Sequence, residues 1–148
     1  MAIRQALPED AHSIKACAYD AYSHYVERMG KDPAPMMADF ESQIGQGIVY
    51  VSSDDENNIQ GFIVFYPKND HLHLENVAVF AQYQGMGIGK KLIAFCENSA
   101  RQSGYSAVEL YTNEKISENL DVYPHLGYRE FDRRSEDGFN RVFFKKEI

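Results

Sequence analysis

The stretch QYQGMGIGKK, from Gln82 to Lys91, has glycine at three alternate positions and ends in two lysines. Glycine permits positive φ and a close approach of the backbone to a ligand. Helical spacing of apolar residues follows directly, and a lysine pair is unfavourable beside the positive end of a helix dipole. An anion held by the N–H groups of the loop would remove this conflict. The stretch therefore predicts an anion-binding loop at a helix N-terminus.

The segments on either side of this loop predict a crossover between two parallel strands. His71–Phe80 is a long strand candidate before the loop, and Ser106–Asn113 is a buried strand candidate after it. Between them, the apolar positions from Ile88 onward indicate an amphipathic helix that ends at Gly104. A strand, a helix and a second strand in this order normally join parallel strands through a right-handed connection.

The remaining segments predict more strands and helices around this unit. Polar turns separate short apolar runs, as is typical of hairpins, and proline interrupts the helical segments near the N-terminus. The predicted strands are Ala2–Ala6, Ile48–Ser53, Ile59–Tyr66, Tyr128–Arg134 and Phe139–Ile148; the predicted helices begin at Pro8 and span Met36–Ile44 and Ser117–Gly127; Pro67–Asp70 is a predicted turn.

The composition indicates one globular domain. The chain has 148 residues, of which 44% are hydrophobic, so we expect a single domain over residues 1–148. A formal net charge of −7 argues against a general nucleic-acid binder, which needs many lysines and arginines. No run approaches the roughly 20 apolar residues that span a bilayer, and no signal peptide is evident. We therefore expect a soluble cytoplasmic protein without nucleic-acid or membrane partners, with Cys17 and Cys96 reduced in its core.

Two well-known phosphate-binding motifs nearly fit the glycine stretch. The dinucleotide fingerprint G-x-G-x-x-G would need glycine at the position of Lys90, although Glu109 lies where a ribose-binding acid could stand. The P-loop pattern would need glycine in place of Gln84 and serine or threonine in place of Lys91. Both motifs are therefore minor alternatives.

Two other motifs resemble those of one enzyme family. The pattern Q-x-x-G-x-G fits Gln84–Gly89 without exception, between the apolar Val77–Val79 and the amphipathic helix. ENLDVYPHLGYRE, from Glu118 to Glu130, resembles a later motif in which a tyrosine precedes a glycine and an aromatic residue. Together with the order of elements along nearly the whole chain, these motifs resemble the GNAT superfamily of acyl-CoA-dependent N-acyltransferases.

This resemblance implies a fold and a co-substrate. The fold class is α/β (α+β), with a mixed, mostly antiparallel sheet of about six to seven strands, about four helices, and a parallel strand pair that splays after the glycine loop. Acetyl-CoA is the implied co-substrate, with no metal, and its pyrophosphate and pantetheine arm would meet mainly backbone groups. The implied coenzyme-binding residues are Val77, Ala78, Val79, Gln84, Gly85, Met86, Gly87, Ile88, Gly89, Lys90, Asn113 and Asn119.

The resemblance also implies the catalytic groups. An acceptor amine with a lysine-like pKa of about 10.4 must lose a proton before it attacks, and Glu75 is the candidate base, acting through water. Tyr123 matches the family's usual general acid, which returns a proton to the CoA thiolate. Pro124 departs from the simple pattern, because proline disfavours helical geometry at the residue before it. The expected acceptor is a primary amine of a small molecule or a peptide, and a homodimer is left open.

Two other classes of function compete with acetyl transfer. His71, His73 and Glu75 alternate along one strand and could together bind zinc, as in a metal-dependent hydrolase. A non-catalytic acyl-CoA-binding module is the other alternative, and the presence of both Glu75 and Tyr123 argues against it. Cys96 belongs to the buried helix stripe and is not expected to be a nucleophile.

Overall fold

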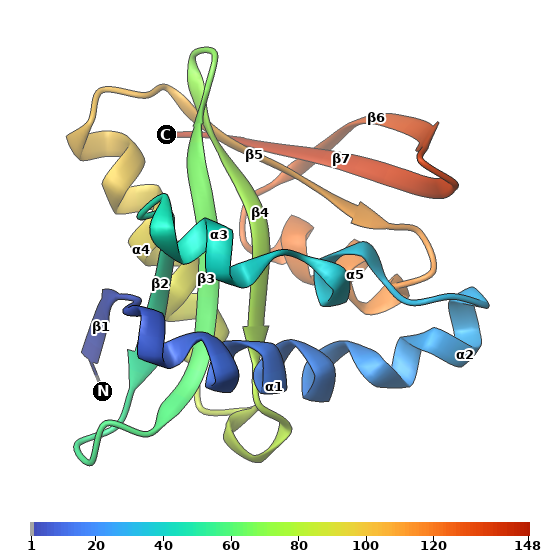
Figure 1. Cartoon of the computed structure of the whole chain (residues 1–148). Coiled ribbons are helices and arrows are strands. Elements are labelled where there is room, and N and C mark those ends of the chain that lie inside the picture. The colour runs from blue at the N-terminus through green and yellow to red at the C-terminus, as the bar shows by residue number, and fades with distance from the viewer. Residues whose placement is uncertain (1) are drawn as a thin grey trace.

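The computed structural model describes residues 2–148 and contains one seven-stranded mixed sheet. Its strand order is β1-β2-β3-β4-β5-β7-β6, and β4 and β5 form its parallel pair (Figure 1). This confirms the predicted fold class. The strands are β1 (Ala2–Gln5), β2 (Val49–Ser53), β3 (Ile59–Lys68), β4 (His71–Val79), β5 (Ala107–Asn113), β6 (Arg129–Glu136) and β7 (Phe139–Glu147).

Helices cover both faces of the sheet. The α1 and α3 helices cross one face in front of β3 and β4, and α4 lies on the other face (Figure 1). Alternation along β3 sends Phe62 and Val64 towards α1 and α3, whereas Ile63 packs with Leu92 of α4. The helices are α1 (Ala11–Tyr22), α2 (Val26–Met29), α3 (Phe40–Gly45), α4 (Ile88–Gln102) and α5 (Ser117–His125), with short 3₁₀ turns η1 (Pro8–Asp10), η2 (Ser23–Tyr25), η3 (Ala34–Met37) and η4 (Ala81–Tyr83).

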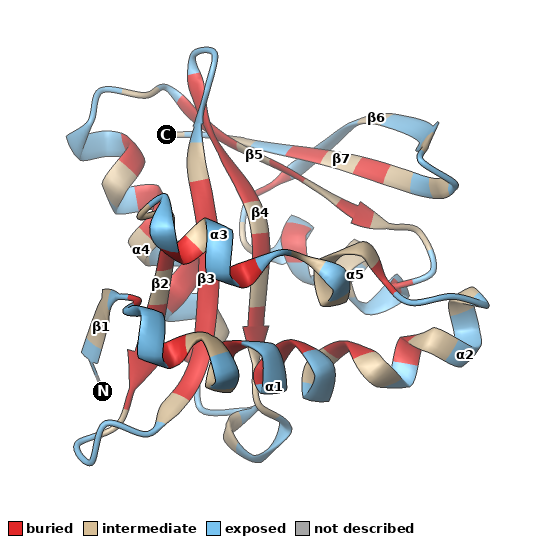
Figure 2. Cartoon of the chain, viewed as in Figure 1, coloured by how far each residue is buried: buried red, intermediate tan, exposed pale blue. Residues whose placement is uncertain are grey.

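The core lies between the sheet and these helices, and Figure 2 shows it as buried segments along the central strands. Cys17 and Cys96 are both buried and free, as the sequence predicts. No helix within residues 2–148 combines the length and the apolar character needed to cross a bilayer.

Two local predictions were wrong. The predicted helix Met36–Ile44 is divided into η3 and α3, because the Asp39 carboxylate accepts the Ser42 N–H and caps a new helix. The predicted turn Pro67–Asp70 is shorter, since β3 continues through Lys68 and the chain reverses at Asn69, which has φ 57°. The helix predicted over Ser117–Gly127 is present as α5, which contains Pro124 and continues to His125.

The β4 strand contains a β-bulge at the point where it separates from β5. Leu74 pairs with Phe65 and Asn76 pairs with Val64, which leaves Glu75 as the extra residue. The parallel pairing of β4 with β5 covers residues 72–74 and 108–110 and then stops. The two strands splay beyond this point, so the rest of β4 has an edge without a neighbouring strand.

The close contact between β3 and β4 gives a first prediction. A Cβ atom added at Gly61 would lie 2.6 Å from the Ala78 carbonyl oxygen, so we expect Gly61→Ala to destabilise the protein by about 3 kcal/mol. Urea denaturation measures this change. Gly45→Ala is the matched control, because the space around Gly45 is open, and its effect should stay within about 0.5 kcal/mol. Equal stability of the two variants would contradict the tight approach.

Candidate active site

The glycine loop presents a row of free backbone N–H groups. Gly85 has φ 84° and Gly87 has φ 79°, conformations that favour glycine, and a Cβ atom at either residue would meet no atom within 4 Å. Gly87 is the N-cap of α4, and the first helical bond runs from the Lys91 N–H to the Gly87 carbonyl. Within residues 2–148, the N–H groups from Gly85 to Lys90 donate no hydrogen bond. The loop therefore has the donor geometry of an anion site.

The other loop residues hold this cradle in place. The Ile88 side chain is buried against the core while its N–H remains free, and Gly89 lies close to Val79, where a Cβ atom would be 3.6 Å from Val79 Cγ2. Gln84 and Met86 are exposed. Before the loop, the Ala81 N–H donates to Asp20 at 2.7 Å, which ties η4 to α1.

The free edge of β4 supplies a second set of backbone groups. Ala78 pairs with Phe62, and the Phe80 N–H donates to the Gln60 carbonyl, so the backbone of Ala78 faces β3. The N–H and C=O groups of Val77 and Val79 therefore point towards the gap between β4 and β5. Ala78, one of the predicted coenzyme-binding residues, therefore presents no backbone group to this gap, and its side chain is buried in the core.

A cavity of about 300 Å³ lies in the gap where β4 and β5 splay. It brings together five of the residues predicted from the sequence: Glu75, Val77, Asn113, Asn119 and Tyr123. Its walls come from β4, β5, β7, α5 and the segment between α2 and α3. Because Val77 lines it, the cavity is continuous with the free edge of β4.

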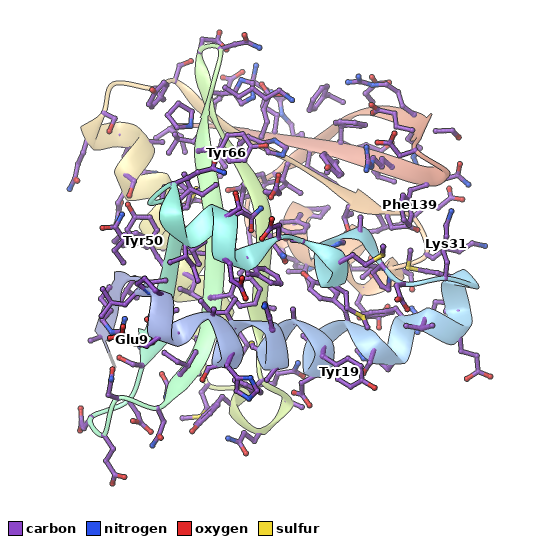
Figure 3. All side chains as sticks on the ribbon, viewed as in Figure 1. Glu9, Tyr19, Lys31, Tyr50, Tyr66 and Phe139 are labelled. Carbon is purple, nitrogen blue, oxygen red and sulfur yellow. The ribbon has the colours of Figure 1, made fainter. Side chains whose placement is uncertain are left out.

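Glu75 lies in this cavity because of the bulge. Its carboxylate accepts one hydrogen bond from the Gln43 amide nitrogen and one from the Tyr66 hydroxyl at 3.1 Å. Burial, and then the charge of Glu75, raise the pKa of Tyr66 to about 12, so its hydroxyl stays protonated and donates. Figure 3 shows Tyr66 on β3, above α3 in this view. Both partners hold the carboxylate in one orientation.

Tyr123 is buried, with 6% of its surface exposed, on the helix α5. Its ring packs edge-on against Tyr128 at 5.7 Å and beside Phe144 at 5.8 Å between ring centroids. Its hydroxyl makes no hydrogen bond to any residue from 2 to 148, although Tyr123 lines the cavity. Burial raises the pKa of this hydroxyl well above its usual value, so it remains a proton donor at neutral pH.

The two asparagines differ in their local roles. The Asn119 side chain donates to the Thr112 hydroxyl at 3.1 Å and so connects α5 to β5. Asn119 is not the N-cap of α5, because that position is Ile116. The Asn113 side chain accepts the Lys115 N–H at 2.8 Å, which makes it a turn former at the end of β5.

The far end of the cavity is closed by a contact between the α2–α3 segment and the β6–β7 turn. Lys31 donates to the Gly138 carbonyl and lies over the ring of Phe139, 4.3 Å from its centroid. Figure 3 shows these two side chains next to each other. Arg141 of β7 lies beside them and stacks on Tyr111 at 4.4 Å.

The histidines open to a different cavity. His71 and His73 line a depression of about 320 Å³ together with Glu109, whereas Glu75 lines the first cavity. Among residues 2–148, no group of three His, Cys, Asp or Glu side chains is placed to hold a metal ion. Burial lowers the pKa of His73 to about 4, so this ring is neutral at pH 7. The structure therefore gives no support to the predicted zinc alternative.

Several residues of the site have contacts that the sequence did not predict. Tyr22, whose helical spacing indicates a core position, shares its hydroxyl proton between the Asn76 side chain at 2.9 Å and the Val77 carbonyl at 3.0 Å. Asn76 is buried and donates in turn to the Pro35 carbonyl. Gln43 and Arg141 carry no local motif. The one signal in the sequence was Asn76 itself, a polar residue that follows Glu75 and breaks the alternation of the strand candidate His71–Phe80.

The sequence that forms this loop, this splayed strand pair and this cavity matches a known family. Residues 12–128 match the family model described as the Acetyltransferase (GNAT) family. The chain belongs to the GNAT family. This confirms the resemblance seen in the sequence and shows that the protein is an acetyltransferase by family.

The sequence identity to individual relatives is low. Probable N-acetyltransferase 14 of Xenopus tropicalis is 28% identical over 88 residues, which are 58% of this chain and 43% of that protein. The chain thus spans less than half of this relative's length. The [Ribosomal protein bS18]-alanine N-acetyltransferase of Haemophilus influenzae is 24% identical over 121 residues, 82% of each chain.

A solved GNAT structure shows the same fold. The PaiA N-acetyltransferase of Thermoplasma acidophilum, solved in complex with coenzyme A, superposes with a TM-score of 0.80 at 16% identity. The match covers 99% of this chain and 98% of that chain. At this identity the likeness establishes the fold alone.

Proposed function

We propose that this protein transfers the acetyl group of acetyl-CoA to a primary amine of a small molecule or a peptide. The observation that supports this most directly is the row of free N–H groups from Gly85 to Lys90, directly after the free edge of β4. A diphosphate fits such a row, and an extended amide arm fits a strand edge. The coenzyme supplies an activated acetyl thioester.

The chain's own residues would hold the coenzyme in three places. Gln84 and the loop from Gly85 to Lys90 would bind the pyrophosphate. Val77 and Val79 would pair with the pantetheine arm through N–H and C=O groups that face the gap. Asn113 and Asn119 line the cavity where the arm would end. Tyr22 already occupies the Val77 carbonyl, so the N–H of Val77 is its free group.

Glu75 and Tyr123 would handle the two protons of the reaction. The acceptor ammonium must lose a proton, and the Glu75 carboxylate in the cavity can receive it directly or through water. The departing thiolate must gain a proton, and the Tyr123 hydroxyl is an uncommitted donor in the same cavity. One group on each side of the gap therefore suits direct attack of the amine.

Thermal unfolding with acetyl-CoA and a thiol-release assay over a panel of amines test this proposal. A ligand at a hundred times its Kd stabilises a protein by about 2.7 kcal/mol, so acetyl-CoA should raise Tm clearly while NAD and ATP should not. Release of free CoA with at least one primary amine should follow. If acetyl-CoA leaves Tm unchanged, or if no amine is acetylated, the proposal fails.

A pair of glycine variants locates the coenzyme at the loop. Gly87 and Gly104 lie at opposite ends of α4, both with φ near 80° and with no atom within 4 Å of an added Cβ. Alanine at either position should cost about 1 kcal/mol of stability through backbone strain. We expect only Gly87→Ala to raise the Kd of acetyl-CoA, by about tenfold or more, as measured by calorimetry. An equal effect of both variants would place the coenzyme elsewhere.

A further inference from the structure

Arg141 is a largely buried cation without a hydrogen-bond partner. Its side chain is 11% exposed, and its guanidinium lies 4.4 Å from the centroid of the Tyr111 ring and 5.9 Å from that of Phe139. Its ion-pair partner Asp137 is 82% exposed and lies 3.5 Å from Nη1, too far for a strong hydrogen bond. The guanidinium donates no hydrogen bond to residues 2–148. The nitrogens of the guanidinium are not fully enclosed by protein atoms, so they can donate to an anion that enters from the cavity.

A second incomplete polar group belongs to a residue that lines the same cavity. The Gln43 side chain donates its amide N–H to Glu75, and its carbonyl oxygen Oε1 is buried and accepts nothing. It is the one buried side-chain oxygen or nitrogen without a partner among residues 2–148. The amide cannot be flipped without turning its oxygen against the carboxylate, so Oε1 stays without a donor among residues 2–148 while the amide nitrogen orients Glu75.

The two incomplete groups share a single space. Gln43, Glu75 and Arg141 all line the cavity of about 300 Å³, and the Tyr111 ring forms the wall under Arg141. Arg141 is the one cationic side chain in this lining. The nearby Lys31 does not line the cavity and instead contacts Gly138 and Phe139. The cavity therefore offers a carboxylate at Glu75 and, at Arg141, a guanidinium that donates no hydrogen bond to residues 2–148 and that also lines the second cavity.

We propose that the acceptor is a small amine that also carries a carboxylate, with the amine held by Glu75, which Gln43 orients, and the carboxylate held by Arg141. This inference rests on the proposed acetyl transfer and specifies its substrate. Guanidinium binds carboxylate through two parallel N–H donors, and its stacking on Tyr111 keeps the planar group in place. A separate ammonium end and carboxylate end fit an amino acid better than a simple alkylamine.

The charge balance of the cavity identifies the competing acceptor. Asp39 and Glu75 are the acidic residues in the lining, and Asp39 also caps α3. A diamine would satisfy both acids and leave Arg141 facing a second cation. Because a guanidinium and an ammonium repel each other in a space with little water, the observed position of Arg141 disfavours the diamine.

A thiol-release assay with matched acceptors tests the inference. The panel pairs α- and ω-amino acids of increasing length with alkylamines and diamines of the same length, and includes short peptides. We expect the best amino acid to exceed its alkylamine by about tenfold or more in kcat/KM. Arg141→Gln should lower kcat/KM for that amino acid by about 10- to 100-fold, mainly through KM, and leave the alkylamine unchanged.

Arg134→Gln is the matched control. Arg134 lies on β6, stacks on Phe143 and lines only the second cavity, so its loss should not change the preference for the carboxylate. Acetyl-CoA binding should be the same in both variants. A wild-type preference for alkylamines or diamines, or an equal loss on both kinds of acceptor in Arg141→Gln, would overturn the inference while acetyl transfer stands. Absence of any turnover would instead remove the proposed function, and this inference with it.

Discussion

Tyr123→Phe is expected to lower kcat by about 10²- to 10⁴-fold while acetyl-CoA still binds. The substitution keeps the ring that packs against Tyr128 and Phe144 and removes only a hydroxyl that has no partner within residues 2–148. No buried group is orphaned, so Tm should change little. Steady-state kinetics and a thermal shift with acetyl-CoA measure both effects.

Tyr128→Phe is the matched control on the same pair of rings. The Tyr128 hydroxyl donates to the buried Glu97 at 2.8 Å, so its removal leaves that carboxylate with only Lys146 and should cost about 1–3 kcal/mol. Its kcat should remain near that of the wild type. Tyr123→Phe should therefore lose turnover, whereas Tyr128→Phe should lose stability. Unchanged turnover in Tyr123→Phe would remove Tyr123 as the general acid.

The raised pKa of Tyr123 also predicts a pH response. Because burial keeps the hydroxyl protonated well above pH 10, the wild-type rate should show no loss from ionisation of this residue up to that pH. The residual rate of Tyr123→Phe should therefore follow the same pH profile as the wild type in this range. A loss below pH 9 that disappears in the variant would assign that titration to Tyr123 and contradict the burial effect.

The sequence predicted the scaffold of the site because its signals are local. Alternating glycines, a helical apolar stripe and short alternating runs each lie within a few residues of one another, and they placed α4, β4 and β5 correctly. The errors arose where two local structural preferences competed. Asp39 capped a new helix within the predicted Met36–Ile44, and β3 continued through Pro67 because strand pairing outweighed the turn propensity of the segment.

The chemistry of the cavity could not be predicted in the same way. Gln43 reaches Glu75 across 32 positions, and Tyr22 reaches Asn76 across 54. No periodicity encodes such pairs, and the bulge that leaves Glu75 unpaired depends on its register with β3. Glu75 was identified through a family resemblance, whereas Arg141 became visible only when β7 was placed beside Tyr111.

Glu75→Gln is expected to lower kcat/KM by about 10²- to 10⁴-fold at neutral pH, and by less as the pH rises. The variant is isosteric, and its amide oxygen can still accept the Tyr66 hydroxyl. The variant has lost the proton acceptor, so it can use only amine molecules that are already unprotonated in solution. For an amine with a pKa of about 10.4 that fraction falls tenfold per pH unit, so the ratio of wild-type to variant rates should grow from pH 9 to pH 7.

Glu109→Gln separates this effect from a general loss of negative charge. Glu109 lies on the next strand, its carboxylate is 3.2 Å from His71 Nδ1, and it lines the second cavity instead of the first. Removing its charge should leave both the rate and its pH dependence close to those of the wild type. A rate ratio for Glu75→Gln that stays constant between pH 7 and pH 9 would mean that proton removal does not pass through Glu75. The carboxylate would then serve to position the amine together with Gln43.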